Sequence, residues 1–129
     1  MSNLVVSNIS DGTTSVGTGY VVNGSAKAWV NFNGTGTIAT RDSLNVASLT
    51  DNGTGAYTIN FTSNMANANF AMPSSSAEDN IQASTGGFLN GRHTNNATVS
   101  SFSMQPNKDG SNNLYDGQIN TAAIFGDLA

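Results

Sequence analysis

His93 is the only histidine of the chain, and it follows Arg92 and Phe88 in a polar segment. A hydrolase triad would need a serine nucleophile and an orienting carboxylate around such a histidine. The sequence contains neither a G-x-S-x-G motif nor a second histidine. We therefore interpret His93 as an exposed or simply hydrogen-bonded side chain, and we predict no catalytic residue and no enzymatic activity.

Two acidic patterns are suited to other chemistry. Glu78 and Asp79 could supply half of a carboxylate pair, but glycoside hydrolysis also needs a second carboxylate at a fixed separation. Asp109, Ser111 and Asn113 have the spacing of the first ligands of a calcium loop, yet Asn120 stands where the bidentate glutamate belongs. Turns rich in Asp, Asn and Gly produce such spacing by chance. We predict no metal and no cofactor.

The single tryptophan, Trp29, lies in the segment AKAWVNFN. Alternation along a strand puts Trp29 on the face opposite Val30 and Phe32, so the indole should project away from the core. Two interpretations follow: a platform on which a sugar stacks, or a surface buried against another subunit. A buried indole would need a partner for its ring nitrogen.

The elements that position these residues are short strands between tight turns. Alternation predicts strands over 26–33 and 56–62, and the second places Tyr57, Ile59 and Phe61 on one face. Asn33-Gly34 and the segment DNGTG at 51–55 supply hairpin turns. Between them, 43–50 reads as one strand whose apolar residues change face, through a bulge or because both faces are covered. Arg41-Asp42 is expected in the turn before it.

The flanking segments are more polar. In the N-terminal stretch, 1–10 predicts a short strand, 11–19 a flexible connector and 20–22 extended structure before the Asn23-Gly24 turn. Residues 73–96 are expected to be mostly loop, with a turn at Asn90-Gly91. Residues 97–105 predict a strand, and 119–125 predict a last strand that is central or at an interface because both of its faces are apolar.

Composition limits the function further. The chain has 129 residues, a formal charge of −4, 9% charged residues and 37% hydrophobic residues. Its four basic residues are scattered, which argues against nucleic-acid binding. There is no cysteine, no apolar run of the roughly 18 residues that span a bilayer, and no pattern typical of a signal peptide. The low apolar content predicts a thin core that association would supplement.

The run AKAWVNFNGTGTIATRDSLNVASLTDNGTGAYTINFTSNMANANF, with the terminal IFGDLA, resembles a domain of tail-fibre and other virion appendage proteins of marine phages, cyanophages above all. The opening MSNLVVSNISDGTT resembles the short leader that precedes this domain. The likeness covers 26–70 and the last residues, and the segment from about 71 to 118 has no counterpart. It implies attachment and architecture without catalysis. Because Trp29 lies inside the recurring block, it favours subunit packing for the indole.

We therefore expect an all-β domain of short antiparallel strands, sandwich-like or jelly-roll-like, over 26–129, preceded by an N-terminal anchor strand and connector over 1–25. An edge strand of the same domain is the alternative for the N-terminal strand. The resemblance implies a structural virion protein, assembled in the host cytoplasm as a short homotrimeric tail fibre or knob. It would contact other virion proteins and a host-surface glycan or protein through loops at about 73–118, and would neither bind nucleic acid nor insert into membranes. Alternatives are a capsid decoration or head-fibre protein and a carbohydrate-binding module.

The candidate subunit-interface residues are Leu4, Val6, Trp29, Ile124 and Phe125. The candidate host contacts are Phe88, Arg92 and His93.

Overall fold

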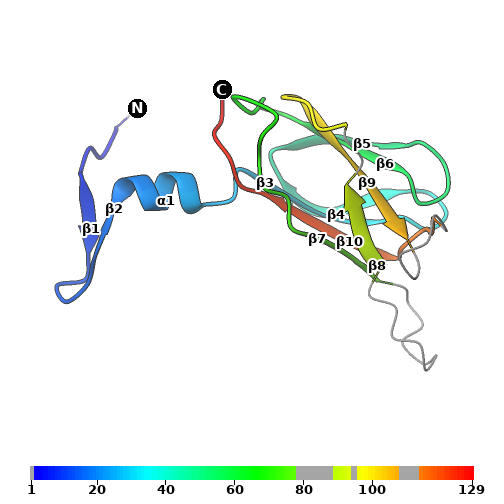
Figure 1. Cartoon of the computed structure of the whole chain (residues 1–129), viewed down its shortest axis with the longest axis horizontal. Coiled ribbons are helices and arrows are strands. Elements are labelled where there is room, and N and C mark those ends of the chain that lie inside the picture. The colour runs from blue at the N-terminus through cyan, green and yellow to red at the C-terminus, as the bar shows by residue number, and fades with distance from the viewer. Residues whose placement is uncertain (1, 78–88, 94–95, 108–113) are drawn as a thin grey trace.

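Ten strands and one short helix make up the described part of the chain (Figure 1). The computed structural model describes residues 2–77, 89–93, 96–107 and 114–129. The elements are β1 (Asn8–Ser10), β2 (Ser15–Gly17), α1 (Thr18–Gly24), β3 (Ala28–Asn33), β4 (Ala39–Leu44), β5 (Val46–Asp51), β6 (Tyr57–Phe61), β7 (Ser74–Ala77), β8 (Leu89–His93), β9 (Ser101–Asn107) and β10 (Ile119–Ile124). The predicted all-β class is confirmed.

Strands β3 to β10 form one sheet that folds over on itself. Their order is β4-β3-β10-β7-β8-β9-β6-β5, and every neighbouring pair is antiparallel. Strands β3 and β6 are separated in this order by four others, yet the rings of Phe32 and Tyr57 meet edge to face at 5.1 Å. The two halves of the sheet therefore face each other as the layers of a sandwich, as Figure 1 shows.

The core is built by strict alternation along the strands. In β3, Ala28, Val30 and Phe32 are buried while Trp29 and Asn31 are half-buried on the outer face. Strand β6 follows the same rule, as the sequence predicted, and so does β9 from the same layer. The buried hydrophobic residues are Ala28, Val30, Phe32, Tyr57, Ile59, Phe61, Met65, Phe102, Met104, Ala122 and Ile124. These residues form one cluster inside the single chain, and the expectation that association supplements a thin core stays a prediction.

Residues 43–50 form two strands where one was predicted. The chain leaves β4 at Leu44, turns through Asn45 and enters β5 at Val46, so it passes from one edge of the sheet to the other. Asn45 has a positive φ of 55°, which asparagine tolerates better than most residues. Its side chain accepts from the Ser63 backbone N–H at 2.7 Å and donates to the Ser63 carbonyl at 3.1 Å. A register shift between Val46 and Ser48 lets both Val46 and Leu49 pack against the core, so the change of face comes from a bulge in β5, one of the two predicted causes.

Three further segments differ from prediction for related reasons. Arg41 and Asp42 lie inside β4 and not in a turn, at an edge where charged side chains discourage pairing with another sheet. Residues 74–77, expected as loop, form β7 because β10 and β8 supply hydrogen-bonding partners on both sides. Asn90 and Gly91 lie within β8 and not at a turn. Neighbouring strands overrode local preference in each case.

The last strand occupies the centre of its layer, one of the two positions predicted for it. Strand β10 pairs with β3 on one side and β7 on the other. Its inner face carries Asn120, Ala122 and Ile124, whereas Ile119 and Ala123 lie on the outer face. Asn120 is a fully buried polar residue, so its hydrogen bonds decide how that end of the sandwich is closed.

Residues 2–25 form an N-terminal arm that projects from the sandwich (Figure 1). The arm consists of the β1–β2 hairpin followed by α1. The expected connector at 11–19 is therefore the turn and second strand of a hairpin, and its turn is held by the Asp11 carboxylate, which accepts from the N–H groups of Thr13 and Thr14. The expected extended segment 20–22 is helical. Strand structure begins at Asn8, later than predicted.

Close approach between two loops fixes the end of the sandwich opposite the arm. The Gly34 N–H donates to the Gly117 carbonyl at 2.9 Å, and the Asn120 amide donates to the same carbonyl at 2.7 Å. Asn120 in turn accepts from the Ser76 hydroxyl at 2.5 Å. A Cβ built on Gly117 would collide with the Ser76 hydroxyl oxygen and lie 2.7 Å from the Asn120 carbonyl oxygen. Only glycine fits there.

We predict that Gly117→Ala lowers the free energy of unfolding by about 1–3 kcal/mol, because a methyl group would force the Asn120 cluster apart. Urea unfolding followed by far-UV circular dichroism measures the change. Gly24→Ala is the control, because a Cβ there meets no atom within 4 Å. Equal stability of the two variants would contradict this account of the loop closure.

Candidate functional site

A buried tyrosine organises the loops at the end of the sandwich opposite the arm. The Tyr57 hydroxyl lies 2.7 Å from the Asp116 carboxylate and 3.0 Å from the Gly34 carbonyl, and it can donate to either. The same carboxylate oxygen accepts from the Gly55 backbone N–H at 2.6 Å. Strand β6 therefore connects the turns at 34 and 55 to the segment at 116. These three loops are separated in sequence and become one rigid unit.

This cluster combines a phenol and a carboxylate, a pair that occurs in catalytic sites. Burial, together with the hydrogen bond to Asp116, raises the pKa of Tyr57 well above its usual value. The phenol is therefore protonated throughout the physiological range and acts as a hydrogen-bond donor. It is also covered by its neighbours, so it offers no reactive oxygen to a substrate. The arrangement is structural.

We predict that Tyr57→Phe lowers the free energy of unfolding at pH 7 by about 1–3 kcal/mol, because Asp116 and Gly34 lose a donor. The folded-state pKa lies above that of the unfolded chain, so the stabilisation is complete below about pH 10 and is lost as the pH rises further, when the unfolded state releases its proton first. The gap between the two proteins should therefore narrow above pH 10. Urea unfolding at intervals from pH 7 to 11 checks this, and parallel stability curves would refute it.

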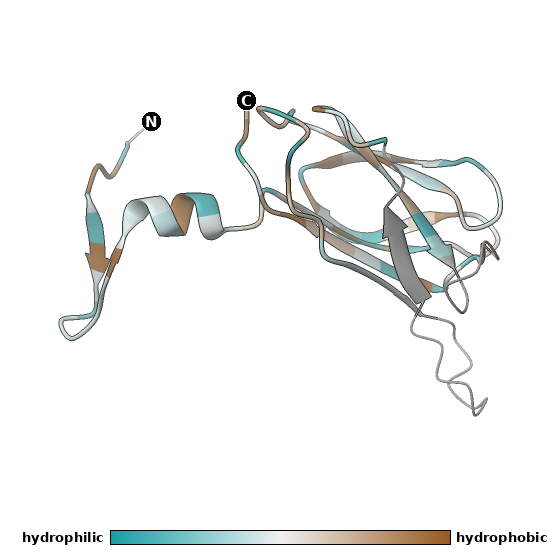
Figure 2. Ribbon diagram, viewed as in Figure 1, coloured by the Kyte–Doolittle hydropathy of each residue, from teal (hydrophilic) through white to brown (hydrophobic). Residues whose placement is uncertain are grey.

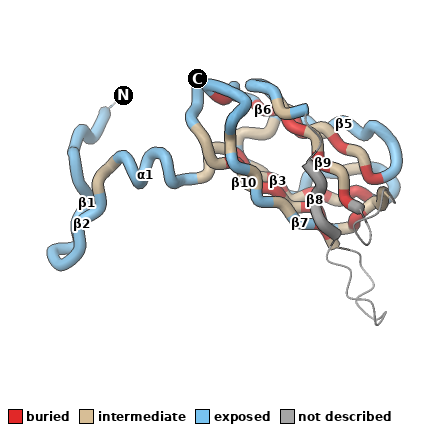
Figure 3. The backbone as a smooth tube through the Cα atoms, in the orientation of Figure 1, coloured by how far each residue is buried: buried red, intermediate tan, exposed pale blue. Residues whose placement is uncertain are grey.

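The N-terminal arm is the most conspicuous candidate surface. None of its described residues is buried, whereas the sandwich contains the entire buried core (Figure 3). Apolar residues nevertheless recur along the arm (Figure 2). Exposed apolar surface of this kind marks a site of association. The exposed large hydrophobic residues of the arm are Leu4, Val5, Val6, Ile9, Val16, Tyr20, Val21 and Val22.

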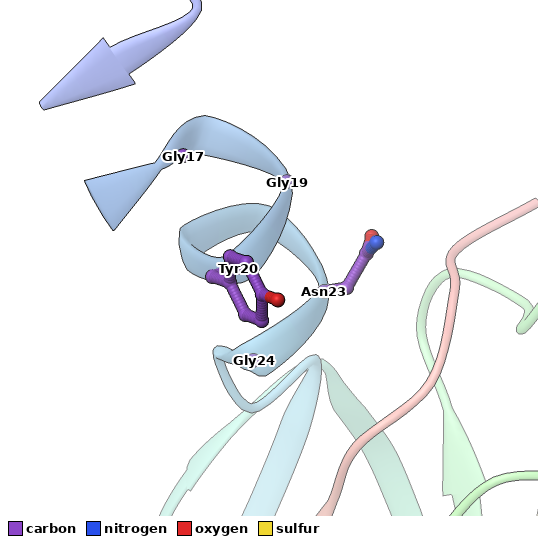
Figure 4. A pocket seen from close by; sticks show the side chains of 5 residues that line it. All are labelled: Gly17, Gly19, Tyr20, Asn23 and Gly24. Atoms are coloured by element: carbon purple, nitrogen blue, oxygen red, sulfur yellow. The ribbon is translucent and has the colours of Figure 1, made fainter.

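Helix α1 has little intrinsic reason to be stable by itself. It is seven residues long, it has no side-chain N-cap, and glycine stands at its second and last positions. Isolated helices of fewer than about 12 residues are marginal in water, and glycine weakens them further. Figure 4 shows the Tyr20 ring lying against the helix while Asn23 projects away from it. Glycines at 17, 19 and 24 leave the surroundings of Tyr20 hollow and open to solvent.

Lys27 fixes the arm where it meets the sandwich. Its ammonium donates to the Val22 carbonyl, to the Ser25 carbonyl at 2.7 Å and to the Ser25 hydroxyl at 3.1 Å. A cation at this position suits the negative end of the α1 dipole. The Lys27 backbone N–H donates to the Ile124 carbonyl at 2.8 Å. One residue therefore joins the end of the helix to the central strand of a layer.

The predicted interface residues do not form one patch. Leu4 and Val6 are exposed on the arm, at 86% and 40%. Trp29 and Phe125 are half-buried on the sandwich. Ile124 is completely buried within the chain, because it lies on the inner face of β10, and it has no surface to offer a partner. Ile124 is thus a core residue, and Leu4, Val6, Trp29 and Phe125 keep surface that a partner could cover.

The predicted host contacts are only partly placed. Phe88 lies outside the described residues, as do Glu78, Asp79 and the Asp109–Asn113 segment. The backbone of Arg92 and His93 belongs to β8, where it pairs with Gln105 and Met104 of β9. These two positions therefore lie in a strand that pairs with β7 on one side and β9 on the other, and not at the tip of a loop.

Sequence reasoning missed a polar row on the outer face of the layer that contains Trp29. Asn31 pairs with Thr121, and Thr121 pairs with Ser75, so the three side chains lie next to one another across β3, β10 and β7. The sequence did contain a signal for this row, because alternation in AKAWVNFN and INTAAI places polar residues on the face opposite the core. Its meaning depended on strand neighbours, which the sequence does not specify.

Within the described ranges, no three His, Cys, Asp or Glu side chains gather closely enough to hold a metal ion. No helix in the described part of the chain is long and apolar enough to cross a membrane.

Comparison with known proteins returned no match: no family model, curated protein or solved structure is similar to this chain. The likeness to phage appendage domains therefore remains a hypothesis. The chain is assigned to no family.

Proposed function

We propose that this chain is a structural protein of a phage particle, a short tail fibre or knob whose N-terminal arm anchors the β-sandwich to a neighbouring subunit. One observation carries the proposal: an arm rich in exposed apolar side chains projects from a sandwich that has closed its own core. The resemblance of the sequence to virion appendage domains supplies the setting.

The separation of roles between arm and sandwich supports this proposal. The sandwich encloses its buried cluster within the single chain. The arm buries nothing, and its helix is too short and too rich in glycine to be stable alone. Docking would remove the apolar side chains of the arm from water, at about 25 cal/mol per Å² of apolar surface. The arm is thus the part of the molecule that gains most from assembly.

A homotrimer remains our proposal for the assembled state. In the proposed trimer, the arm supplies the apolar surface that the subunits share. Three arms gathered at one point would cover one another's apolar residues and leave three sandwiches facing outward. A decoration protein on a capsid would use an arm in the same way, and microscopy of the particle separates the two locations.

We predict that Leu4→Asp combined with Val5→Asp abolishes incorporation into particles and reduces the mass found by light scattering from trimer to monomer. Both side chains are exposed in the single chain, at 86% and 90%, so the changes should leave the sandwich folded. Burying two unpaired carboxylates at a docking site would be prohibitive. Mass spectrometry of purified particles and static light scattering are the measurements.

Thr13→Asp is the matched control, because it adds a charge to the exposed turn of the same arm. Particles that still carry the doubly substituted protein would refute the arm as anchor. A stable monomer of the unmodified 13.2 kDa chain at micromolar concentration would refute the trimer.

The predicted host contacts give a separate test. Alanine at Phe88, Arg92 and His93 should reduce adsorption of particles to host cells by tenfold or more while leaving incorporation unchanged, because these side chains belong to the proposed outward region. Adsorption rates measured at equal particle number check the expectation. Unchanged adsorption would remove all three as contacts.

A further inference from the structure

The outer face of β3, β10 and β7 is hollowed into an open groove of about 490 Å³. This volume lies within the range of sites that hold small molecules. The groove lies on the face away from the core, and no part of the arm lines it. The side chains that matter for recognition are Trp29, Asn31, Pro73, Ser75, Thr121 and Ala123.

Strand register orders these side chains into an apolar row and a polar row. Trp29 pairs with Ala123, whose small side chain leaves space beside the indole. Two residues along, Asn31, Thr121 and Ser75 form the polar row. Positions two apart on a strand are separated by about 6.6 Å, which is comparable to the width of a sugar ring. One ring can therefore reach both rows.

The polar row retains capacity for hydrogen bonds. The Asn31 carbonyl oxygen accepts from the Arg41 guanidinium at 3.3 Å, and its amide NH₂ donates to nothing among the described residues. The Ser75 and Thr121 hydroxyls are 2.8 Å apart, so one donates to the other and the second keeps its proton for a ligand. Amide and hydroxyl groups of this kind match the hydroxyl groups of a sugar.

The groove is uncharged, and this selects among sugars. No Asp, Glu, Lys or Arg side chain is among the described residues that line it, and the whole chain has a formal charge of −4. Arg41 lies outside the lining and already donates to Asn31, so an anionic ligand would lose its hydration and gain this cation only by breaking that hydrogen bond. A neutral ring loses little, because its apolar face covers the indole while its hydroxyls meet the polar row.

We propose that this groove binds one or two residues of a neutral glycan, with the indole of Trp29 stacked on a sugar ring and Asn31, Thr121 and Ser75 bonded to its hydroxyls. A glycan site here adds a ligand class to the proposed attachment role and adds a contact on a sheet face to the contacts proposed for the loops. The groove does not involve the arm. Failure of the anchor test would therefore not contradict the glycan site, and failure of the sugar titrations would not contradict the arm as anchor.

The single tryptophan makes the test direct, because its fluorescence reports the groove alone. The full chain is titrated with maltotriose, mannotriose, chitotriose and lactose, and with sialyllactose as the anionic counterpart. We expect a saturable change of Trp29 emission with at least one neutral sugar, with a dissociation constant on the order of 1 mM. Sialyllactose should bind more weakly than lactose.

Asn31→Ala and Thr121→Val keep the tryptophan and should each weaken binding about fivefold to tenfold, through loss of a hydrogen bond. Trp29→Ala, measured by calorimetry, should abolish binding. Thr40→Val is the control, since Thr40 is exposed on β4 outside the groove. Circular dichroism verifies that each variant is folded.

Three outcomes would overturn the proposal. The first is an unchanged emission with every neutral sugar up to tens of millimolar. The second is tighter binding of sialyllactose than of lactose. The third is an emission that shifts to the blue as the protein concentration rises, together with a higher mass by light scattering, because a second copy would then cover this face.

Discussion

The folding of one sheet onto itself is the constraint on which the rest of this molecule depends. Strands β3 and β6 stand far apart in the order of the sheet, yet Phe32 and Tyr57 meet across the core. The hydroxyl of Tyr57 reaches beyond that contact to Asp116 and Gly34. The same residue therefore contributes apolar surface to the core and holds three loops at its edge. Both the arm and the outer groove are positioned by strands that this closure fixes.

Much of the sandwich could be predicted from alternation. In β3 and β6, each apolar residue that the period of two placed inward is buried, and Trp29 lies outward as expected. The period succeeded because each strand has one buried and one solvent-facing side. It failed at Asn45, where a single residue in the left-handed region divides what reads as one strand into two. A register shift between Val46 and Ser48 then brings both Val46 and Leu49 against the core, whereas strict alternation would place them on opposite faces.

Other failures came from partners that the sequence does not reveal. The segment SSSA has weak intrinsic preference for a strand, but β8 and β10 pair with it on both sides. Residues 20–22 carry two valines and read as extended, yet they lie in α1, where Lys27 occupies the carbonyls at the helix end. The polar row of Asn31, Thr121 and Ser75 joins three distant segments.

The place at which the arm enters the sandwich determines how the molecule would bear load. The arm continues into β3 at Ala28, and Ala28 pairs with Ile124 at the end of β10. The arm and the C-terminal residues therefore leave from the same end of the sandwich. Tension between the arm and the loop at Gly117 would run along the strands and would strain the β3–β10 hydrogen bonds together. Tension between the arm and the C-terminus would first break the bridges of Phe125 to Ala71 and of Leu128 to Met65, and would then peel the β3–β10 bonds apart one after another. Under a pull from the arm to the far end, the sandwich would therefore resist with the whole β3–β10 strand pair at once.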